Sequence, residues 1–551
     1  MRVLPGGARQ WPLVSSAVVL GALAILVLPI FAGIPAEVAA VTAAFVVFVS
    51  AYHRSALRWR SLLALLLLVI LFVPIRRYVL PGNLPFQLEP YRILVALLFV
   101  MWLTSLLIDP RVRFRRTGLE APLLLFLAAA AASVIVNSSR VTAGAVDSNV
   151  IKSFTFLASF VLVVYMIVSL IRRESDIIFL LKVLVVGGAI LAVLAIVESR
   201  THFNVFDHLG SVIPILKANG TTGDLTRIGR FRAVGPAEHP IALSAALAML
   251  VPLAGYFAYT LRRKRWWLAM GLIVLGCLAT VSRTGVLMLG SEALVFAILR
   301  PQQMKRAWPA LLPLLVVVHV ALPGTLGTLK ASFFPKGGLA QEQQGYEGTG
   351  RFGAARLDPT FAEIKTSPLL GIGYGTRITG FNNPEANAIT LDDQWLDTVL
   401  ETGIVGAFAW MWLIVRVVRR LGSAARRDPS SRGWLLAALA ASLVAYGISM
   451  ITYDAFSFVQ VTFFFFIVLA FAARLMPSPS PALAPAAVPQ LDRARSSGAL
   501  AHAMFVLAAA LVLFVFFQGP SVNFLILVLI LLLIGASSIE KARRRVQAPA
   551  R

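Results

Sequence analysis

Polar side chains that could perform chemistry lie at the ends of long apolar segments in this chain. One group is in "RFRAVGPAEHPIALSAALAML" (230–250), where Arg230, Arg232, Glu238 and His239 precede an apolar run. Proline is favoured in the first turn of a helix, so the proline after His239 predicts that a helix begins there. Arginine side chains bind phosphate oxygens, and carboxylates or imidazoles accept protons. These residue types therefore suit phosphate binding and proton transfer.

A second group surrounds Arg283 in "LATVSRTGVLML" (278–289), between two apolar runs and without an acidic neighbour in sequence. Two interpretations are open. An arginine inside a membrane is energetically costly and normally faces a polar interior or a cavity. Alternatively, Ser282 and Gly285 form a tight turn at the membrane surface, and Arg283 reaches the lipid headgroups.

A third segment, "GTGRFGAARLDPTFAEIKTSPLLGIGYGT" (348–376), contains Arg351 and ends in a glycine-rich stretch. Asp358 followed by Pro359 predicts the start of a short helix, which Pro368 should end. Because the apolar side chains of that helix share one face, we expect it to lie on the membrane surface. "GIGYG" lacks the strand–loop–helix context of a nucleotide-binding loop, so it predicts a tight turn near a substrate.

The fourth segment, "DDQWLDTVLETGIVG" (392–406), begins with Asp392 and Asp393 and then becomes apolar. Either Asp392 is a general base, if burial or Asp393 raises its pKa, or it caps the helix that begins near Gln394. Adjacent aspartates project in different directions, and the chain has only six histidines. No compact set of metal ligands results, so we predict no metal site and no cofactor.

The chain around these segments is too apolar for a soluble protein. Of its 551 residues, 58% are hydrophobic and 14% are charged, whereas soluble domains are about half apolar and about a quarter charged. Continuous apolar runs of about 20 residues predict membrane-spanning helices, whereas a membrane barrel would show short alternating segments. The predicted fold is therefore all-α, a polytopic transmembrane bundle of about sixteen helices. The runs cover residues 12–33, 37–52, 60–75, 90–108, 119–137, 152–171, 177–197, 239–260, 266–281, 283–299, 307–323, 396–418, 433–452, 457–474, 500–518 and 521–538.

Basic residues indicate the orientation of these helices. If both termini are cytoplasmic and each run crosses once, the loops rich in arginine and lysine fall on the cytoplasmic side, as the positive-inside rule requires. Arg76 and Arg77 are the exception, because this scheme places them outside. The two long loops, 198–238 and 325–395, also lie outside, and the second contains Arg377. The net charge of +25 thus follows from topology, and we predict no nucleic-acid binding.

The apolar runs divide the chain into four parts. Residues 1–58 form an N-terminal transmembrane pair, and residues 59–475 form a transmembrane core with the two outer loops. Residues 476–498 contain "MPSPSPALAPAAVPQ", a Pro/Ala-rich segment typical of a flexible cytoplasmic linker. Residues 499–551 form a C-terminal transmembrane pair with a basic tail. The single cysteine, Cys277, excludes a disulfide within the chain.

Four motifs occur in the order found in the O-antigen ligase and O-antigen polymerase superfamily, which the chain resembles over about residues 60–475. They are "RAVGPAEHPIALS", "SRTG", "GR" followed by "SPLLGIGYG", and "DDQWLDTVLETGIVG". Members of that superfamily are polytopic bacterial glycosyltransferases that act on undecaprenyl-diphosphate-linked glycans outside the plasma membrane. About twelve of the apolar runs fall in this range, which matches the usual core of the family.

The resemblance implies roles for individual residues. Arg232, Arg283 and Arg351 correspond to the arginines that bind the donor diphosphate. In the family, a histidine in a His-Asn-x-aromatic-Leu motif activates the acceptor, whereas here Asp392 stands at the histidine position. The chain therefore uses Asp392 as the base or has lost this activity. Further candidates for substrate binding are Arg230, Glu238, His239, Arg377 and Asp393.

The predicted function is a membrane glycosyltransferase of the bacterial plasma (inner) membrane. It would move or polymerise glycan from a polyprenyl-diphosphate donor, on the extracytoplasmic face, to a glycan, lipid or protein acceptor. One alternative is a transporter or flippase of lipid-linked sugars, which would be expected to spread its charges through several helices. A second alternative is an inactive scaffold of an envelope polysaccharide complex, which the missing histidine favours.

Overall fold

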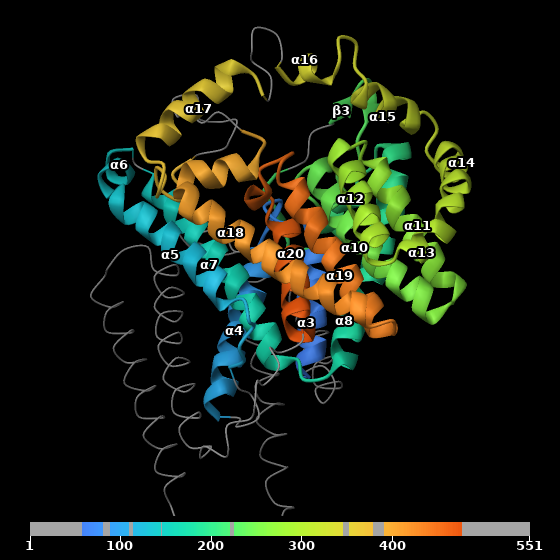
Figure 1. The fold of residues 1–551 in the computed structure, drawn as a ribbon, viewed down its shortest axis with the longest axis horizontal. Coiled ribbons are helices and arrows are strands. Elements are labelled where there is room, and N and C mark those ends of the chain that lie inside the picture. The colour runs from blue at the N-terminus through green and yellow to red at the C-terminus, as the bar shows by residue number, and fades with distance from the viewer. Residues whose placement is uncertain are drawn as a thin grey trace, which may run out of the picture.

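The computed structural model describes residues 58–80, 89–108, 114–144, 146–220, 225–344, 352–377 and 391–476. Within these ranges the chain forms eighteen α-helices, α3 to α20 (Figure 1), together with two pairs of very short strands. The all-α architecture is therefore confirmed for this part of the chain. The apolar runs at 12–33, 37–52, 500–518 and 521–538, and the linker after Met476, lie outside the described residues.

The helices are α3 (Trp59–Phe72), α4 (Pro90–Ile108), α5 (Glu120–Val136), α6 (Ser138–Ala143), α7 (Asp147–Leu170), α8 (Glu174–Thr201), α9 (Leu209–Val212), α10 (Pro240–Leu261), α11 (Lys264–Ala279), α12 (Arg283–Leu299), α13 (Pro301–Ala307), α14 (Leu311–Ala321), α15 (Thr325–Phe333), α16 (Leu339–Gln344), α17 (Ala354–Thr366), α18 (Gln394–Arg427), α19 (Ser431–Ser449) and α20 (Val459–Leu475). The strands are β1 (Tyr78–Val79), β2 (Lys217–Ala218), β3 (Thr226–Arg227) and β4 (Arg230–Phe231). Strands β1 and β2 pair antiparallel, as do β3 and β4.

Each apolar run predicted between residues 60 and 475 contains a helix. Among the described residues, five helices are long and apolar enough to cross a membrane: α7, α8, α10, α18 and α19. A sixth span would result from α14 and α15 together, which are bent by 110° at their junction. The protein is therefore a polytopic helical membrane protein.

One face of the bundle, here called the loop face, carries the non-helical segments 202–239 and 367–377 and helices α15 to α17. Helices α15, α16 and α17 lie together at the top of Figure 1. Segments distant in sequence meet on this face: Asn137 Nδ2 donates to the Gly371 carbonyl at 2.9 Å, and Gln394 N donates to the Met450 carbonyl at 2.8 Å.

The other ends of the helices gather on what is here called the basic face, which carries the turns before α5, α8, α13, α19 and the end of α20. Arginine side chains there bind backbone carbonyls of neighbouring turns. Arg474 Nε donates to Ile171 O at 3.0 Å, Arg416 Nε to Gly118 O at 3.0 Å, and Arg300 Nη2 to Asp428 O at 2.6 Å. The grouping of basic loops predicted from the charge pattern is thus present in the fold.

Helix α20 lies in the centre of the bundle, with α10 and α19 beside it. The side chains of Val459–Leu475 are almost all buried, including the aromatic run Phe463–Phe466. Those rings pack on Phe160 of α7, Trp410 of α18 and Tyr446 of α19. A helix that is apolar on every side is buried on every side.

Arg77 explains the exception in the charge pattern. Its Nη1 lies 2.8 Å from Asp207 Oδ1, and its Nη2 donates to the carbonyls of Gly235 and Ala237. The side chain is only 7% exposed. Arg77 therefore ties the end of α3 to the segment 202–239, and this buried structural role explains its position on the loop face.

The predicted start of the short helix at Asp358–Pro359 is wrong. Helix α17 begins at Ala354, after the N-cap Gly353, and Pro359 lies inside it. Proline has no backbone N–H to donate within a helix. Helix α17 nevertheless forms one turn before Pro359. The helix does end before Pro368, as predicted, and Phe361 on its surface is exposed.

Candidate functional site

The start of α18 is held by Asp393. The Oδ1 atom of Asp393 accepts hydrogen bonds from Trp395 N at 2.9 Å and Leu396 N at 3.1 Å, which is the expected geometry of an N-cap. Asp392 precedes the cap, with a positive φ of 51°. The capping role considered for Asp392 therefore belongs to Asp393.

Helix α18 is interrupted soon afterwards at Gly403, whose φ is 67° and ψ is −172°. The glycine-rich segment 371–375 runs beside this break: Ile372 N donates to Leu400 O at 2.9 Å, and Ile404 N donates to Pro368 O at 2.9 Å. A Cβ at Gly371 or Gly403 would collide with the backbone of the other segment. The glycines therefore allow two backbones to approach closely, as the sequence predicted for a tight turn.

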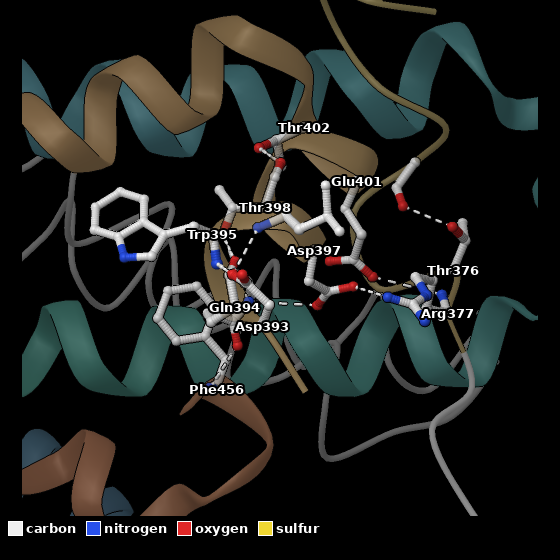
Figure 2. Close-up of polar contacts among 12 residues, drawn as sticks. Thr376, Arg377, Asp393, Gln394, Trp395, Asp397, Thr398, Glu401, Thr402 and Phe456 are labelled. Carbon is white, nitrogen blue, oxygen red and sulfur yellow. Dashed lines mark hydrogen bonds and ion pairs between the residues drawn. The ribbon is translucent and has the colours of Figure 1, made fainter. Parts of the chain in front are cut away.

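A group of acidic side chains lies near Arg377 at the start of α18, and Figure 2 shows Arg377 with Asp397 and Glu401. Arg377 Nη1 forms an ion pair with Asp397 Oδ1, and its backbone N donates to Glu401 Oε1 at 3.5 Å. Asp454, in the turn before α20, is 5% exposed. Burial and the charges of Asp397 and Asp392 raise the pKa of Asp454 to about 7, although Arg377 opposes this shift. We call these residues the carboxylate cluster: Asp392, Asp397, Glu401, Asp454 and Arg377.

Arg232 and Arg283 meet the same turn between α11 and α12. Arg232 Nε donates to the Thr280 carbonyl at 3.0 Å, and Arg283 is the first residue of α12. Val281 has a positive φ of 49°, so a tight turn does precede Arg283, although Gly285 lies inside α12 rather than in the turn. Arg283 contacts Glu342 of α16, 2.8 Å from Oε2. Its guanidinium therefore forms an ion pair within the protein.

Arg232 retains unused hydrogen-bonding capacity. Its side chain is buried, and within the described part of the chain its Nη2 atom has no hydrogen-bond partner. Burial, with the charge of Arg227, lowers the pKa of Arg232 to about 10, so the group stays cationic at neutral pH. A buried donor without a partner is rare in native proteins and is an indication of a ligand site.

His239 caps α10 as a neutral imidazole. Its Nδ1 accepts a hydrogen bond from Ile241 N at 3.2 Å, and its ring lies 5.9 Å from that of Phe458. Burial and the charges of Arg232 and Arg227 lower the pKa of His239 to about 4. The protonated form, which could not accept this bond, is therefore disfavoured.

The segment of Arg283 contacts the segment of Asp454. Thr284 Oγ1, one residue after Arg283, lies 2.9 Å from Thr452 Oγ1. Thr452 is two residues before Asp454, whose pKa responds to Asp392. The start of α12 thus lies against the turn that completes the carboxylate cluster.

The structure places the remaining predicted residues differently. Arg230 is half-buried and donates to the Pro323 carbonyl at the bend between α14 and α15. Glu238 lies near Arg76, whose Nε is 3.5 Å from its Oε1. Arg351 lies outside the described residues, so the convergence of three arginines stays a prediction.

Sequence reasoning missed Asp397, Glu401 and Asp454. Asp393, Asp397 and Glu401 are four residues apart, a spacing that places side chains on one side of a helix. That signal was available in the sequence. Asp454 lies 53 to 61 positions from these three residues, and only the packing of α19 and α20 beside α18 brings it there.

Among the described residues, no group of three or more histidine, cysteine, aspartate or glutamate side chains could hold a metal ion. The carboxylate cluster instead contains an arginine, Arg377, that pairs with Asp397. The contacts of the cluster include this ion pair and a hydrogen bond that Gln394 Nε2 donates to Asp397 Oδ2 at 3.3 Å.

Comparison with known proteins gives one family. No curated protein sequence matched the chain. One family model matches residues 268–411, a range that contains Arg283, Arg377, Asp392 and Asp393. Arg232 and Glu238 precede this range. The family resemblance seen in the motifs is confirmed, because residues 268–411 match the family model described as O-antigen ligase.

Proposed function

We propose that this protein transfers glycan from a polyprenyl-diphosphate donor to an acceptor hydroxyl at the loop face. The observation that supports this most strongly is positional. The O-antigen ligase match includes both Arg283 and Asp392, and Arg232 is hydrogen-bonded to the turn just before Arg283. The arginines that would bind the diphosphate and the carboxylate that would act as the base thus belong to one face of the bundle.

Arg232 and Arg283 would bind the diphosphate leaving group. The unpartnered Nη2 of Arg232 can donate to a phosphate oxygen without breaking a bond in the protein. Glu342 pairs with Arg283, and a more highly charged diphosphate would replace that carboxylate. Guanidinium groups suit this role because they bind phosphate oxygens bidentately and keep their charge.

Asp392 would act as the general base. The acceptor oxygen forms a bond to the anomeric carbon, its proton passes to Asp392, and the bond from that carbon to the diphosphate oxygen breaks. The electron pair of the broken bond leaves with the polyprenyl diphosphate, whose developing charge the arginines stabilise. The cap at Asp393 and the helix that follows fix Asp392 in position, and such preorganisation is what a catalytic group requires.

The reaction would occur on the extracytoplasmic side of the bacterial inner membrane. Basic turns gather on the face opposite the carboxylate cluster, which supports this orientation under the positive-inside rule. Single cysteines placed in 202–216 or 325–340, in a Cys277→Ser background, should react with an impermeant thiol reagent added to spheroplasts. In spheroplasts the outer surface of the inner membrane is accessible and the membrane itself is intact. Labelling only after permeabilisation would reverse the orientation.

The glycan profile of a deletion strain tests the function itself. Shortened glycans would identify a polymerase, and full-length glycans left on the lipid carrier would identify a ligase. Restoration by the wild-type gene but not by a gene encoding Arg232→Ala is expected. An unchanged profile in the deletion strain would contradict the proposal, and accumulation of lipid-linked glycan on the cytoplasmic side would favour a flippase.

A further inference from the structure

A buried carboxyl group on the loop face has no function in the reaction described above. Glu238 immediately precedes His239, and its side chain is 12% exposed. Neither Oε1 nor Oε2 accepts a hydrogen bond from any described residue. The nearest cationic atom is Arg76 Nε, 3.5 Å from Oε1.

The groups around Glu238 come from several separate elements. Glu89, before α4, is 1% exposed in its side chain and lies 3.0 Å from Arg92 Nη2. It also accepts a hydrogen bond from Arg76 N at 3.4 Å. Lys152, near the start of α7, is exposed. It interacts electrostatically with Arg76, Arg92, Glu89 and Glu238. Arg76 is 41% exposed, so these charged groups extend from the surface inwards to Glu238.

Two of the neighbouring cations are engaged elsewhere. Arg77 binds Asp207 and two backbone carbonyls, and Arg92 binds Glu89 and the hydroxyl of Tyr91. Two acceptor oxygens of Glu238 are therefore buried without a donor, an arrangement that is rare in native proteins. Burial raises the pKa of Glu238 to about 7, against the opposing charges of Arg76, Arg77 and Lys152 and with the support of Glu89.

A ligand that binds Glu238 should supply hydrogen-bond donors, because both unpartnered oxygen atoms are acceptors. Among the components of a lipid-linked glycan, the diphosphate offers acceptors and the polyprenyl chain is apolar. Only the sugar carries neutral donors, in its hydroxyl groups. Glu238 and Arg232 belong to the same segment of the loop face, and the charge of Arg232 lowers the pKa of His239, the residue that follows Glu238.

We propose that Glu238, with Arg76 and Lys152 at the rim, forms a binding subsite for the sugar attached to the diphosphate, and that Glu238 accepts hydrogen bonds from its hydroxyl groups. This subsite rests on the function proposed above. In this subsite Glu238 distinguishes the glycan from the lipid diphosphate, so Glu238 determines specificity for the donor sugar.

Ligand binding to the purified full-length protein tests this subsite. The probes are undecaprenyl diphosphate without sugar and undecaprenyl diphosphate carrying the glycan extracted from the producing cells. Affinity is measured from the shift in Tm, followed by tryptophan fluorescence, over a range of probe concentrations. The variants are Glu238→Gln and, as a matched control on the basic face, Glu174→Gln, whose carboxylate is exposed and lies 3.9 Å from Arg432.

Glu238→Gln should bind the glycan-bearing lipid about tenfold more weakly than wild type, because a charge-assisted hydrogen bond is lost. Its affinity for undecaprenyl diphosphate should not change. Its Tm without ligand should be equal to or higher than that of wild type, since a buried unpartnered carboxylate is destabilising. Glu174→Gln should bind both lipids like wild type.

Two results would overturn the inference. If Glu238→Gln binds both lipids as tightly as wild type, the subsite is refuted while the proposed function stands. If neither lipid shifts the Tm of the wild-type protein, the proposed function fails and the subsite fails with it. A lower Tm of Glu238→Gln without ligand would show that Glu238 is a structural ion-pair partner, and would also refute the subsite.

Discussion

Replacing Arg232 by lysine separates guanidinium binding from simple positive charge. In the structure, Nε is used by the Thr280 carbonyl, and Nη2 is buried without a partner among the described residues. A lysine ammonium can satisfy one of these two directions but not both. If Nη2 binds the leaving diphosphate, its loss removes a donor directed at developing charge, which costs roughly 2.7–4 kcal/mol or about 10²–10³ in rate.

Arg232→Lys should therefore reduce transfer about as much as Arg232→Ala does. The free energy of unfolding should change by only about 1 kcal/mol, because one neutral carbonyl loses its partner. The rate is measured with purified protein and a lipid-linked glycan donor. Arg200→Lys is the matched control, since Arg200 Nη2 also donates to a backbone carbonyl, that of Ala321 at 2.8 Å, but is exposed. A wild-type rate in Arg232→Lys would refute the guanidinium contact, and a loss of rate that follows a loss of folded protein would reduce Arg232 to a structural role.

Three further changes test the physical roles of individual groups. Asp393→Ala should lower stability by about 1 kcal/mol through loss of the N-cap, whereas Asp393→Asn should not; equal Tm values for the two variants would contradict the capping role. Arg77→Met should destabilise the protein by about 3–5 kcal/mol, because Asp207 and two carbonyls lose their buried partner, and a Tm like that of wild type would contradict this. The pKa of Asp454 is higher in the folded protein than in the unfolded chain. Its contribution to stability is therefore present below about pH 4 and is lost as the pH rises to about 7. Asp454→Asn should flatten this fall in Tm, and an unchanged pH profile of Tm would show that Asp454 does not titrate there.

The helices were predictable because the membrane imposes a simple rule on sequence. Lipid requires continuous apolar runs of helical length, and the predicted runs 90–108 and 283–299 coincide with α4 and α12. The start of α17 was not predictable in the same way. Asp358–Pro359 is a good helix start by local preference, but the residues before it also form helix, and local preference does not decide between the two.

The candidate site was predictable only in part. Each of its motifs was visible in the sequence because polar residues stand out against apolar runs. What the sequence could not show is which motifs meet, since Asp454 and Arg377 are brought together by the packing of separate helices. Arg77 illustrates the same difficulty, because its charge departs from the topology pattern and only the fold shows its buried partner, Asp207.

The most direct test of the glycosyltransferase account is transfer by the purified protein with Asp392 intact and with Asp392→Asn. Asparagine is tolerated at positive φ, and Asp393 supplies the cap, so this substitution should leave the fold unchanged while it removes the proton acceptor. With an undecaprenyl-diphosphate glycan as donor, wild-type protein should produce transferred glycan and free undecaprenyl diphosphate, and Asp392→Asn protein should produce neither. Transfer at the wild-type rate by Asp392→Asn would contradict the assignment of the base, and absence of transfer by the wild-type protein with donor and acceptor present would contradict the account as a whole.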